Sequence, residues 1–300
     1  MFRNLLDALE DLINNGYDWA NYQNSSTMGS NSAQAQGSKF EDFVKDILCG
    51  VRASDSHGRA KIFETHLAYQ GSANYPPDAM YRGGDSGDAF EAKKTENINL
   101  STLDLNSSHP YSHLTSDLSR LASEAKNCEV WKQRDIFYVI GNVQKTRPKG
   151  NWMWMVQGSL FAADLETYRN FEKEIKSHIE IAIKSKGLVP GETNELGRIN
   201  SVDLLEITDL RVRGMWHIES PTKLFRGLSG IKESPSDGLV VHCLMRKSKW
   251  ESLLLNKSQE SKNFWLNQKK KNFQLVDLTV PDPDNSKGVV DTKLIRVVVN

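Results

Sequence analysis

Apolar residues at helical spacing mark the start of the chain. The apolar stripe within residues 2–13 repeats every three or four positions, which is the period of an amphipathic helix. Residues 22–38 are rich in Asn, Ser, Gln and Gly, and this composition predicts a loop. Ser38 followed by Glu41 has the form of a capping box, so a second helix is expected to begin there. The apolar stripe of that helix consists of Phe40, Phe43, Val44, Ile47 and Leu48.

Beyond the second helix, the pattern predicts both strands and helices. Residues 65–70 form a short strand candidate, and a hairpin follows directly. Leucines and alanines at helical spacing in residues 111–126 predict a helix. The apolar runs 135–143 and 152–156 predict buried strands, and residues 165–183 predict a long amphipathic helix. The order helix, three strands, helix, two strands indicates an α/β protein whose mixed sheet is flanked by helices.

After residue 187, the pattern changes to strand candidates separated by polar loops. The candidates are residues 203–218, 238–246, 273–280 and 292–299. Pro281 and Pro283, among polar residues, mark a loop between the last two. The C-terminal part of the chain is therefore expected to be mainly β.

Composition narrows the class of protein. The chain has 300 residues, which suits one large domain or two small ones, and 38 basic residues balance 38 acidic ones. A net charge of zero argues against a protein that coats nucleic acid indiscriminately, although basic residues can still line a single cleft. Cys49, Cys128 and Cys243 are isolated and odd in number, which favours reduced thiols in a cytoplasmic protein. We find no apolar run of membrane-spanning length, and the N-terminal pattern is that of an amphipathic helix rather than a signal peptide.

The hairpin that follows the first strand candidate carries the most informative residues. Three glycines within residues 83–87 form a strong turn signal, and the flanking runs can extend as strands. If residues 83–86 form a four-residue loop, Asp78 lies directly opposite Glu91 on the neighbouring strand. The Cβ atoms of directly opposed residues are about 4.5–5.5 Å apart. Two carboxylates at that distance repel each other unless a cation lies between them.

The spacing also places a lysine beside the two acids. Glu91 and Lys93 are two residues apart, so they project from the same face of a strand, while Phe90 and Ala92 project into the core. The hairpin therefore gathers two hard oxygen ligands and one amine on one side. Carboxylates that leave room for phosphate and water suit Mg²⁺. The Pro-Asp pair at Asp78 followed by acid-any-Lys is the sequence form of a metal-dependent phosphodiesterase site.

Other interpretations of the hairpin stay open. An acid-any-Lys triplet occurs by chance in most chains, and opposed acids also occur on solvated surface hairpins. Asp78 and Glu91 could also be the paired acids of a glycoside hydrolase, which would need no Mg²⁺ but would leave Lys93 unexplained. Asp88 falls on the face opposite Glu91, and Asp85 is most simply a turn residue.

The element order, with this hairpin at its centre, resembles the PD-(D/E)xK nuclease fold, a restriction-endonuclease-like mixed sheet flanked by helices. More specifically, the chain resembles the NgoPII-type family of type II restriction endonucleases. The blocks that carry this resemblance are residues 40–46, 74–94, 105–110, 195–203 and 210–216. They span most of the chain and include long stretches outside the acidic motif, which makes the resemblance more specific than the motif alone.

The resemblance implies a division of the chain into three parts. Residues 1–37 would be an N-terminal helix and polar loop, and residues 38–186 a nuclease core. Residues 187–300 would form a mainly β region for DNA recognition and dimerisation, compact with the core.

The resemblance also implies a reaction, which is Mg²⁺-dependent hydrolysis of double-stranded DNA to 5′-phosphate and 3′-hydroxyl ends. Asp78 and Glu91 would hold the metal against the scissile phosphate. Lys93 would orient the attacking water and stabilise the negative charge that develops. Glu41 is the candidate for an additional acid, because nucleases of this fold often bring one from the first core helix. The capping box alone would also explain Glu41.

Candidate DNA contacts lie in two of the resembling blocks. Arg211 and Arg213 share a face of a strand-like run, and arginine pairs bidentately with guanine in the major groove. Trp216 could stack or pack nearby. The alternative for the arginines is a surface pair in ion pairs with Asp209 or Glu206.

The second block is the run Asn106, Ser107, Ser108 and His109, which could contact phosphate or base edges. An ordinary loop at the entry to a helix explains these four residues almost as well.

The partners follow from the symmetry of the substrate. The two strands of a palindrome are related by a two-fold axis, so cutting both needs two equivalent active sites and hence a homodimer. The resemblance implies a short GC-rich target of the GGCC kind and a cognate DNA methyltransferase that protects the host. Two rival functions remain at this point, namely a structure-directed DNA repair nuclease of the same fold and a non-catalytic DNA-binding protein.

Overall fold

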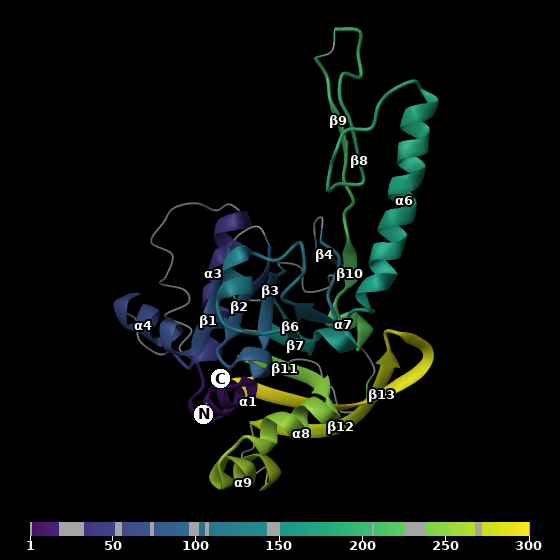
Figure 1. Cartoon of the computed structure of the whole chain (residues 1–300). Coiled ribbons are helices and arrows are strands. Elements are labelled where there is room, and N and C mark those ends of the chain that lie inside the picture. Colours follow the sequence, from purple (N-terminus) through teal and green to yellow (C-terminus); the bar gives the residue numbers. More distant parts are fainter. Residues whose placement is uncertain are drawn as a thin grey trace.

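A large mixed β-sheet runs through the molecule and separates two hydrophobic cores (Figure 1). The computed structural model describes residues 2–17, 33–51, 56–72, 75–95, 102–105, 108–142, 151–205, 207–225, 228, 238–267 and 272–299. In spatial order, the strands are β1 (Leu67–Ser72), β2 (Tyr75–Tyr81), β3 (Ala89–Lys94), β6 (Gln133–Asn142), β7 (Asn151–Gln157), β11 (Leu239–Arg246), β13 (Asn285–Val299) and β12 (Phe273–Asp282). An additional strand, β5 (His113–Thr115), pairs with the start of β6.

The sheet combines parallel and antiparallel pairs. The pairs β3–β6 and β7–β11 are parallel, and the other neighbouring pairs are antiparallel. A parallel pair needs a crossover connection. Between β3 and β6 the chain passes through β4 (Thr102–Asp104), β5 and the short helix α5 (Ser123–Asn127). The strands β11, β12 and β13 extend the sheet that carries the hairpin, so the C-terminal third of the chain is continuous with it.

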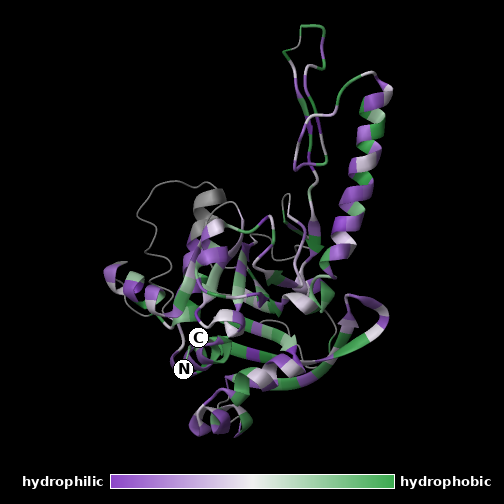
Figure 2. Ribbon diagram, viewed as in Figure 1, coloured by the Kyte–Doolittle hydropathy of each residue, from purple (hydrophilic) through white to green (hydrophobic). Residues whose placement is uncertain are grey.

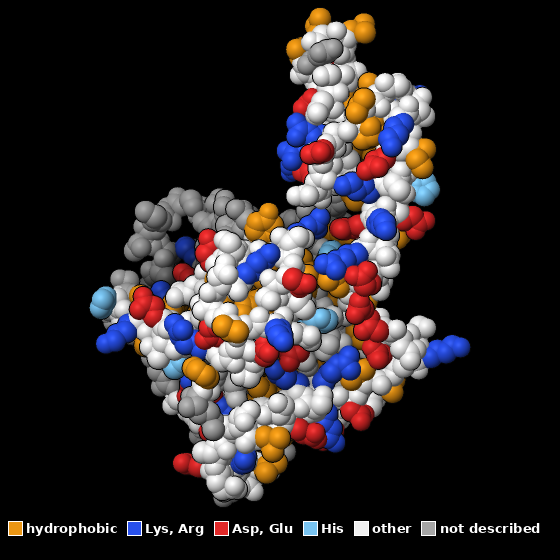
Figure 3. Space-filling model, viewed as in Figure 1, with side chains coloured by type: hydrophobic (Ala, Val, Ile, Leu, Met, Phe, Trp, Pro, Cys, Tyr) orange, Lys and Arg blue, Asp and Glu red, His pale blue; other side chains and the backbone are white. Residues whose placement is uncertain are grey.

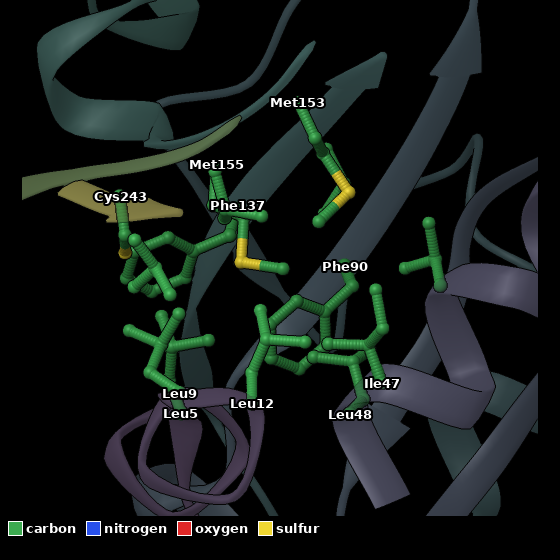
Figure 4. Close-up of a cluster of buried hydrophobic side chains, with 14 of the residues drawn as sticks. Leu5, Leu9, Leu12, Ile47, Leu48, Phe90, Phe137, Met153, Met155 and Cys243 are labelled. Carbon is green, nitrogen blue, oxygen red and sulfur yellow. The ribbon is translucent and has the colours of Figure 1, made fainter. Parts of the chain in front are cut away.

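Helices cover one face of the sheet and bury the first core. The main ones are α1 (Leu5–Asn15), α3 (Ala33–Cys49) and α8 (Lys247–Leu255), and two further helices contribute Phe63 and Trp265. Figure 4 shows leucines of α1 and the C-terminal end of α3 meeting side chains of the central strands, among them Phe90, Phe137, Met153 and Met155. These strand positions are completely buried, as their period-two spacing requires.

The N-terminal helix is confirmed and has its own capping box. The Asn4 side chain accepts a hydrogen bond from the Leu6 amide at 2.9 Å, and the Asp7 carboxylate accepts one from the Asn4 amide at 2.8 Å. Both bonds satisfy amide groups that the first turn of a helix leaves unpaired.

The opposite face of the sheet carries the second core. Its strand side chains include Met80, Ala89, Tyr138, Ile140, Trp154, Leu244 and Leu294. The segment between β4 and β6 packs over them and contributes Leu114, Leu118, Leu121 and Ala125. Figure 2 shows the strands as predominantly hydrophobic and the outer surfaces of the helices as more polar.

An arm projects away from the sheet (Figure 1). We use this name for the helix α6 (Leu165–Ser185), the segment 186–196, and the hairpin of β8 (Gly197–Ile199) and β9 (Leu210–Val212). At its base, β10 (His217–Glu219) pairs with β4, which connects the arm to the body. The remaining elements are α4 (Ser56–His66), α7 (Pro221–Leu224), α9 (Gln259–Asn267) and the short 3₁₀ turns η1 (Gly84–Ser86) and η2 (Gly158–Leu160).

The prediction for residues 111–126 was wrong in its backbone but right in its buried side chains. The predicted helix is replaced by β5, turns and α5, while Leu114, Leu118 and Ala125 are buried as expected. The edge of β6 captures residues 113–115 by antiparallel pairing. The Thr115 hydroxyl then donates to the Asp117 carboxylate at 2.5 Å, which stabilises a turn. Tertiary pairing therefore overrides helical spacing here.

Three further boundaries differ from the predictions. The helix α3 begins at Ala33 rather than at Ser38, because the run from Ala33 to Gln36 consists of good helix formers. Ser38 is thus inside the helix, and the predicted capping box with Glu41 is wrong. Residues 203–218 form not one strand but the separate strands β9 and β10, and α4 was not predicted. Most of the predicted loop 22–38, namely residues 22–32, lies outside the described residues.

Among the residues that the structure describes, there is no helix with the length and apolarity that crossing a bilayer requires. The three cysteines are free: Cys49 and Cys243 are buried and Cys128 is half-buried.

A buried ion-pair network ties α8 to the strands that carry the hairpin. Lys249 Nζ lies 2.5 Å from Asp88 Oδ1 and 2.7 Å from Asp135 Oδ2. Asp88 precedes β3 and Asp135 belongs to β6, so one ammonium group joins the starts of two parallel strands. The Asp88 side chain is 1% exposed, on the sheet face opposite Glu91 as predicted.

We expect Lys249→Met to lower the free energy of unfolding by about 3 kcal/mol at neutral pH, because it leaves the buried Asp88 carboxylate without its counter-charge. Burial raises the pKa of Asp88 above its ordinary value even with Lys249 present. The folded protein therefore takes up a proton at Asp88 more readily than the unfolded chain. Because Lys249 lowers the pKa of Asp88, the variant has the higher folded pKa at this carboxyl group. The loss of stability should be complete above the folded pKa of Asp88 in the variant and should shrink as the pH falls through that value.

Urea unfolding at several pH values measures this loss. The exposed Lys247 is the matched control, and Lys247→Met should change stability by no more than about 0.5 kcal/mol. Equal free energies of unfolding for the two variants would contradict the role of Lys249 as the counter-charge of Asp88.

Candidate functional site

A cleft of about 1080 Å³ lies between the β2–β3 hairpin and the arm. The body contributes Glu41, Asp78, Glu91 and Lys93 to its lining. The arm contributes α6 side chains, residues 193–196 and the end of β9. Side chains from distant parts of the sequence thus face one solvent-accessible space.

The hairpin has the predicted register. Ala79 pairs with Phe90 and Met80 with Ala89, and the Tyr81 amide donates to the Asp88 carbonyl at 2.9 Å. Continuing this register places Asp78 opposite Glu91. At that point the Ala92 amide donates to the Asp78 side chain, with a distance of 2.7 Å to Oδ2. The carboxylate is therefore held in place by the backbone of the opposite strand.

A glycine on the neighbouring strand permits this geometry. A Cβ atom added to Gly71 would lie 2.5 Å from the Asp78 Cα atom, which is closer than atoms can approach. The adjacent strand β1 also has an irregular register between Gln70 and Ser72. The β1 backbone thus packs directly against the backbone of Asp78, and only glycine fits.

The turn of the hairpin is anchored to the chain around the start of β6 by two acidic side chains, one from each side. Glu129 Oε2 accepts hydrogen bonds from the amides of Gly83 and Gly84 at 3.0 and 2.9 Å. Asp85 accepts from the amides of Lys132 and Gln133 at 2.5 and 3.2 Å, which confirms its prediction as a turn residue. These bonds fix the turn at the end of the hairpin remote from the cleft.

Lys93 and Glu91 project together into the cleft, as their spacing predicts. Lys93 Nζ lies 2.6 Å from Glu91 Oε1, while Glu91 Oε2 is buried and has no hydrogen-bond partner among the described residues. The negative charges of Glu91 and Asp78 raise the pKa of Lys93. Lys93 is therefore positively charged at neutral pH.

Asp78 lies in an environment that disfavours its negative charge. Burial, and secondly the charge of Glu91, raise its pKa well above the ordinary value, and Lys93 offsets only part of this shift. A perturbed carboxyl group in a cleft, beside a second carboxylate, is typical of a functional site. A divalent cation between the two carboxylates would remove the repulsion.

The donor set fits Mg²⁺. Asp78 Oδ1 and Glu91 Oε2 are not used in any described hydrogen bond, and both residues line the open cleft. Within the described residues, no three His, Cys, Asp or Glu side chains converge on one point to form a complete metal cage. Mg²⁺ sites of phosphoryl-transfer enzymes need no such cage, because substrate and water supply the other oxygens.

Glu41 approaches the same site from α3. With the helix beginning at Ala33, its carboxylate is not needed for a cap and instead lines the cleft. Burial, followed by the charges of Lys45 and Glu91, perturbs Glu41, and the net effect is a raised pKa. Glu41, Glu91 and Lys93 all line the same cleft, and the charges of the latter two contribute to the pKa of Glu41.

The arginines predicted to contact DNA lie on the arm wall of the cleft. Glu195 Oε1 lies 2.8 Å from Arg211 Nη2 and 2.7 Å from Arg213 Nε. Glu195 Oε2 accepts a further bond from Arg211 Nε at 2.9 Å. Both guanidinium groups remain about half exposed, so the shared carboxylate holds two donors side by side at the cleft surface. Of the predicted alternative partners, Asp209 pairs with Arg198 instead, and Glu206 lies outside the described residues.

Trp216 and His109 pack together at the base of the arm. His109 is 5% exposed and stacks on Tyr168 of α6 at 5.3 Å between ring centroids. Trp216 contacts the edges of both rings and donates from Nε1 to Glu172 at 3.2 Å. These rings attach α6 to the body. His109 also lines the cleft, so its expected contact with DNA stays a prediction, as does that of Trp216.

The other residues of the predicted contact block divide in two. Ser108 lines the cleft, as expected for a phosphate contact. Asn106 and Ser107 lie outside the described residues.

Sequence analysis missed the basic residues that line the cleft from α6 and the neighbouring loop. These are Arg120, Arg169, Lys173 and Lys176. The spacing of four and three residues on α6 places Arg169, Lys173 and Lys176 along one side of the helix, a signal that the sequence contains. In all, seven Lys and Arg and five Asp and Glu line a cleft in a chain of zero net charge.

The comparisons with known proteins point to one family. The model of the family described as NgoPII restriction endonuclease matches residues 3–281. The chain is 34% identical over 292 residues to the type II restriction enzyme NgoPII of Neisseria gonorrhoeae, covering 97% of this chain and 98% of that protein. No solved structure matches the chain.

We expect Asp78→Asn to raise the free energy of unfolding of the metal-free protein by about 1 kcal/mol at pH 8, because it removes one of two repelling carboxylates. The raised pKa of Asp78 means that the wild-type site costs stability only above the ordinary Asp value. The gain should therefore be absent near pH 4, grow as the pH rises from about 4 towards the folded pKa of Asp78, and be complete above that value.

Urea unfolding in EDTA at pH 5 and pH 8 measures the gain. Asp42, a carboxylate with 56% side-chain exposure on the same helix as Glu41, provides the control variant Asp42→Asn, which should show no gain. A loss of stability on Asp78→Asn would show that the carboxylate is structural.

Proposed function

Because the chain belongs to the NgoPII restriction endonuclease family, we propose that Asp78, Glu91 and Lys93 form the active site of this site-specific deoxyribonuclease. The reaction is Mg²⁺-dependent hydrolysis of double-stranded DNA. One observation supports this assignment above the others: two half-buried to buried carboxylates oppose each other at an open cleft, with a lysine bonded to one oxygen and a second oxygen left unpaired.

Asp78 and Glu91 would hold the metal through Asp78 Oδ1 and Glu91 Oε2. Bound Mg²⁺ polarises the scissile phosphate and lowers the pKa of the attacking water. The other two oxygens keep their present partners: Ala92 N fixes Asp78 Oδ2, and Lys93 Nζ fixes Glu91 Oε1. In each carboxylate, one oxygen thus keeps the side chain in place and the other is available for the metal.

Lys93 supplies positive charge where negative charge develops. Its ammonium group is held by Glu91 and donates to a non-bridging oxygen of the scissile phosphate as a fifth oxygen joins the phosphorus atom. The bond from phosphorus to O3′ then breaks, and O3′ takes up a proton. The products are a 5′-phosphate and a 3′-hydroxyl.

Glu41 is the proposed additional acid. Its raised pKa and its position in the cleft suit a group that accepts a proton from water or completes the metal site. The core that carries these residues, with the hairpin at the centre of a mixed sheet and α3 on one face, is assigned to the restriction-endonuclease-like fold.

The arm provides the DNA-binding wall. The basic side chains of α6 would contact phosphates, and Arg211 and Arg213 would read guanines, which suits a short GC-rich palindrome of the GGCC kind. A palindrome requires a second copy of the chain to cut the other strand, so the active form is proposed to be a homodimer. A cognate methyltransferase is the functional partner, because the host genome also contains the site.

We expect Lys93→Ala to reduce cleavage of plasmid DNA by about a thousandfold or more, because the transition state loses a preorganised positive charge. Binding to the same DNA in Ca²⁺ should change only a few-fold. Quantified gel assays of cleavage in Mg²⁺ and gel shifts in Ca²⁺ measure the two effects.

Lys94→Ala is the matched control for this experiment, because Lys94 projects from the other face of β3 and does not line the cleft. Wild-type protein should give discrete fragments that EDTA abolishes. A smear would indicate a structure-directed nuclease, and intact DNA with every substrate would refute the proposed reaction.

We expect Arg211→Ala and Arg213→Ala each to weaken binding to the cleavage site by about tenfold to a hundredfold, since a bidentate guanine contact is worth about 1–3 kcal/mol. Binding to DNA without the site should fall much less. Arg198→Ala is the control, because Arg198 lies on the same hairpin, pairs with Asp209, and does not line the cleft.

Competition binding with site-containing and site-free duplexes of equal length distinguishes base recognition from contacts to phosphates alone. An equal loss on both duplexes would mean that the arginines contact phosphates only and would contradict base recognition.

A further inference from the structure

The end of the arm exposes a dense group of apolar side chains. We call residues 202–210 the arm tip. The exposed fractions of its apolar side chains are 44% for Val202, 103% for Leu204, 76% for Leu205, 78% for Ile207 and 48% for Leu210. Figure 3 shows hydrophobic groups gathered at the end of the arm, far from either core.

Hydrogen bonds hold the arm tip in a defined shape. The Val202 amide donates to the Thr208 carbonyl at 2.8 Å, and the Leu205 amide donates to Asp203 Oδ1 at 2.8 Å. Hydrogen bonds to its side chain, first from Thr208, lower the pKa of Asp203, so this carboxylate is ionised and bonded within the loop. These bonds hold the backbone of the loop, while the leucine side chains are exposed.

The charges of the arm tip argue against DNA as its ligand. Between Arg198 and Arg211 the sequence has no Lys or Arg, and it places Asp203, Glu206 and Asp209 there. Phosphate groups would be repelled by such a surface, and contacts to phosphates provide most of the affinity of proteins for DNA. The complementary surface is therefore an apolar protein surface.

We propose that the arm tip binds the arm tip of a second copy of this chain, and that the two joined arms close around the DNA. This inference rests on the proposed function, which requires two copies related by a two-fold axis at the palindrome. A surface on a two-fold axis meets itself, and an apolar surface is complementary to itself whereas a charged one is not. The arm extends beyond the body along one side of the cleft, so its end is free to reach across the bound DNA (Figure 1).

The size of the surface indicates when the contact forms. A patch of five such side chains is on the order of a few hundred Å². A stable dimer buries about 800 Å² on each partner. The arm tips alone therefore associate weakly, and they join when DNA holds two copies at a high local concentration.

Cross-linking at the arm tip tests the contact directly. Leu204→Cys places a thiol at the most exposed position of the tip, and Val130→Cys places one at a position of the body with 97% exposure. Both changes are made in the Lys93→Ala background and treated with a short bis-maleimide, with and without a duplex that spans one mapped cleavage site.

We expect Leu204→Cys to give a covalent dimer at least tenfold faster on this duplex than without DNA, and Val130→Cys to give none above the background of the native cysteines. Absence of the DNA-dependent dimer with Leu204→Cys would overturn the proposal.

A second variant tests the contribution of the apolar surface. The triple change Leu204→Ser, Leu205→Ser and Ile207→Ser should weaken assembly of two copies on one duplex by about a hundredfold, measured by sedimentation. On supercoiled plasmid at low enzyme concentration, it should release nicked circles where wild-type protein releases linear DNA. The body variant Val130→Ser, Leu255→Ser and Leu266→Ser, which removes three other exposed apolar side chains, should behave like wild-type protein.

The outcomes separate this proposal from the proposed function. Intact plasmid with wild-type protein, or one copy per duplex at saturation, would refute the proposed nuclease dimer itself. A wild-type dimer that the tip variant leaves unchanged would overturn only the tip contact. A tip variant that keeps the dimer but loses DNA affinity would show that the tip inserts between base pairs, which would also overturn the proposal. Circular dichroism melting curves identify any variant that fails to fold, in which case the cross-linking result decides.

Discussion

The repulsion between Asp78 and Glu91 is the constraint on which the site depends. Two carboxylates, opposed across a hairpin and partly withdrawn from water, disfavour each other's charge, and the raised pKa of Asp78 reports this. Lys93 compensates for part of the repulsion through its contact with Glu91. The remaining imbalance would favour the binding of a divalent cation between the two carboxylates. A hairpin that splayed apart would relieve the repulsion and lose the site.

The surrounding structure prevents the hairpin from splaying. Phe90 packs on the first core at 6.0 Å between its ring centroid and that of Phe137, and Tyr81 meets its edge at 5.0 Å. At the other end, Arg134 is completely buried and donates to the Tyr81 carbonyl at 2.6 Å and to Glu129 at 2.8 Å. Lys249 of α8 forms ion pairs with Asp88, directly before β3, and with Asp135 of β6. The hydrophobic effect and buried ion pairs thus offset the destabilisation that the repelling carboxylate pair causes.

The distribution of charge in the cleft suits the proposed binding of a polyanion by a chain without net charge. Basic side chains from α6 and β9 lie on the arm wall, and the acids of the proposed active site lie on the body. Glu195 forms ion pairs with both arginines that are proposed to read guanine, so in this proposal it is an internal anion that the DNA must displace. Such ion pairs favour specificity. Only a DNA sequence with well-placed hydrogen-bond acceptors compensates for the lost contacts between Glu195 and the arginines.

The sequence alone determined the local features of this protein. The glycine turn and the period-two alternation of the hairpin predicted the register of Asp78 and Glu91 and the shared face of Glu91 and Lys93, because a short antiparallel hairpin leaves few other arrangements. The long apolar runs predicted β6, β7 and β11, and the amphipathic stripes predicted α1 and α6. The family resemblance was also carried by residues visible in the sequence, and the comparisons confirmed it.

Tertiary structure decided what depends on residues distant along the chain. Pairing with the edge of β6 produces a strand and turns where a helix at 111–126 was predicted. Because α3 begins at Ala33, Glu41 is not part of its N-terminal cap. Packing against Tyr168 made His109 and Trp216 a structural joint, and the arm brought α6, Glu195 and Arg211 opposite the hairpin. Local periodicity records which side of a segment is apolar, but it contains no information about which segment will cover that side.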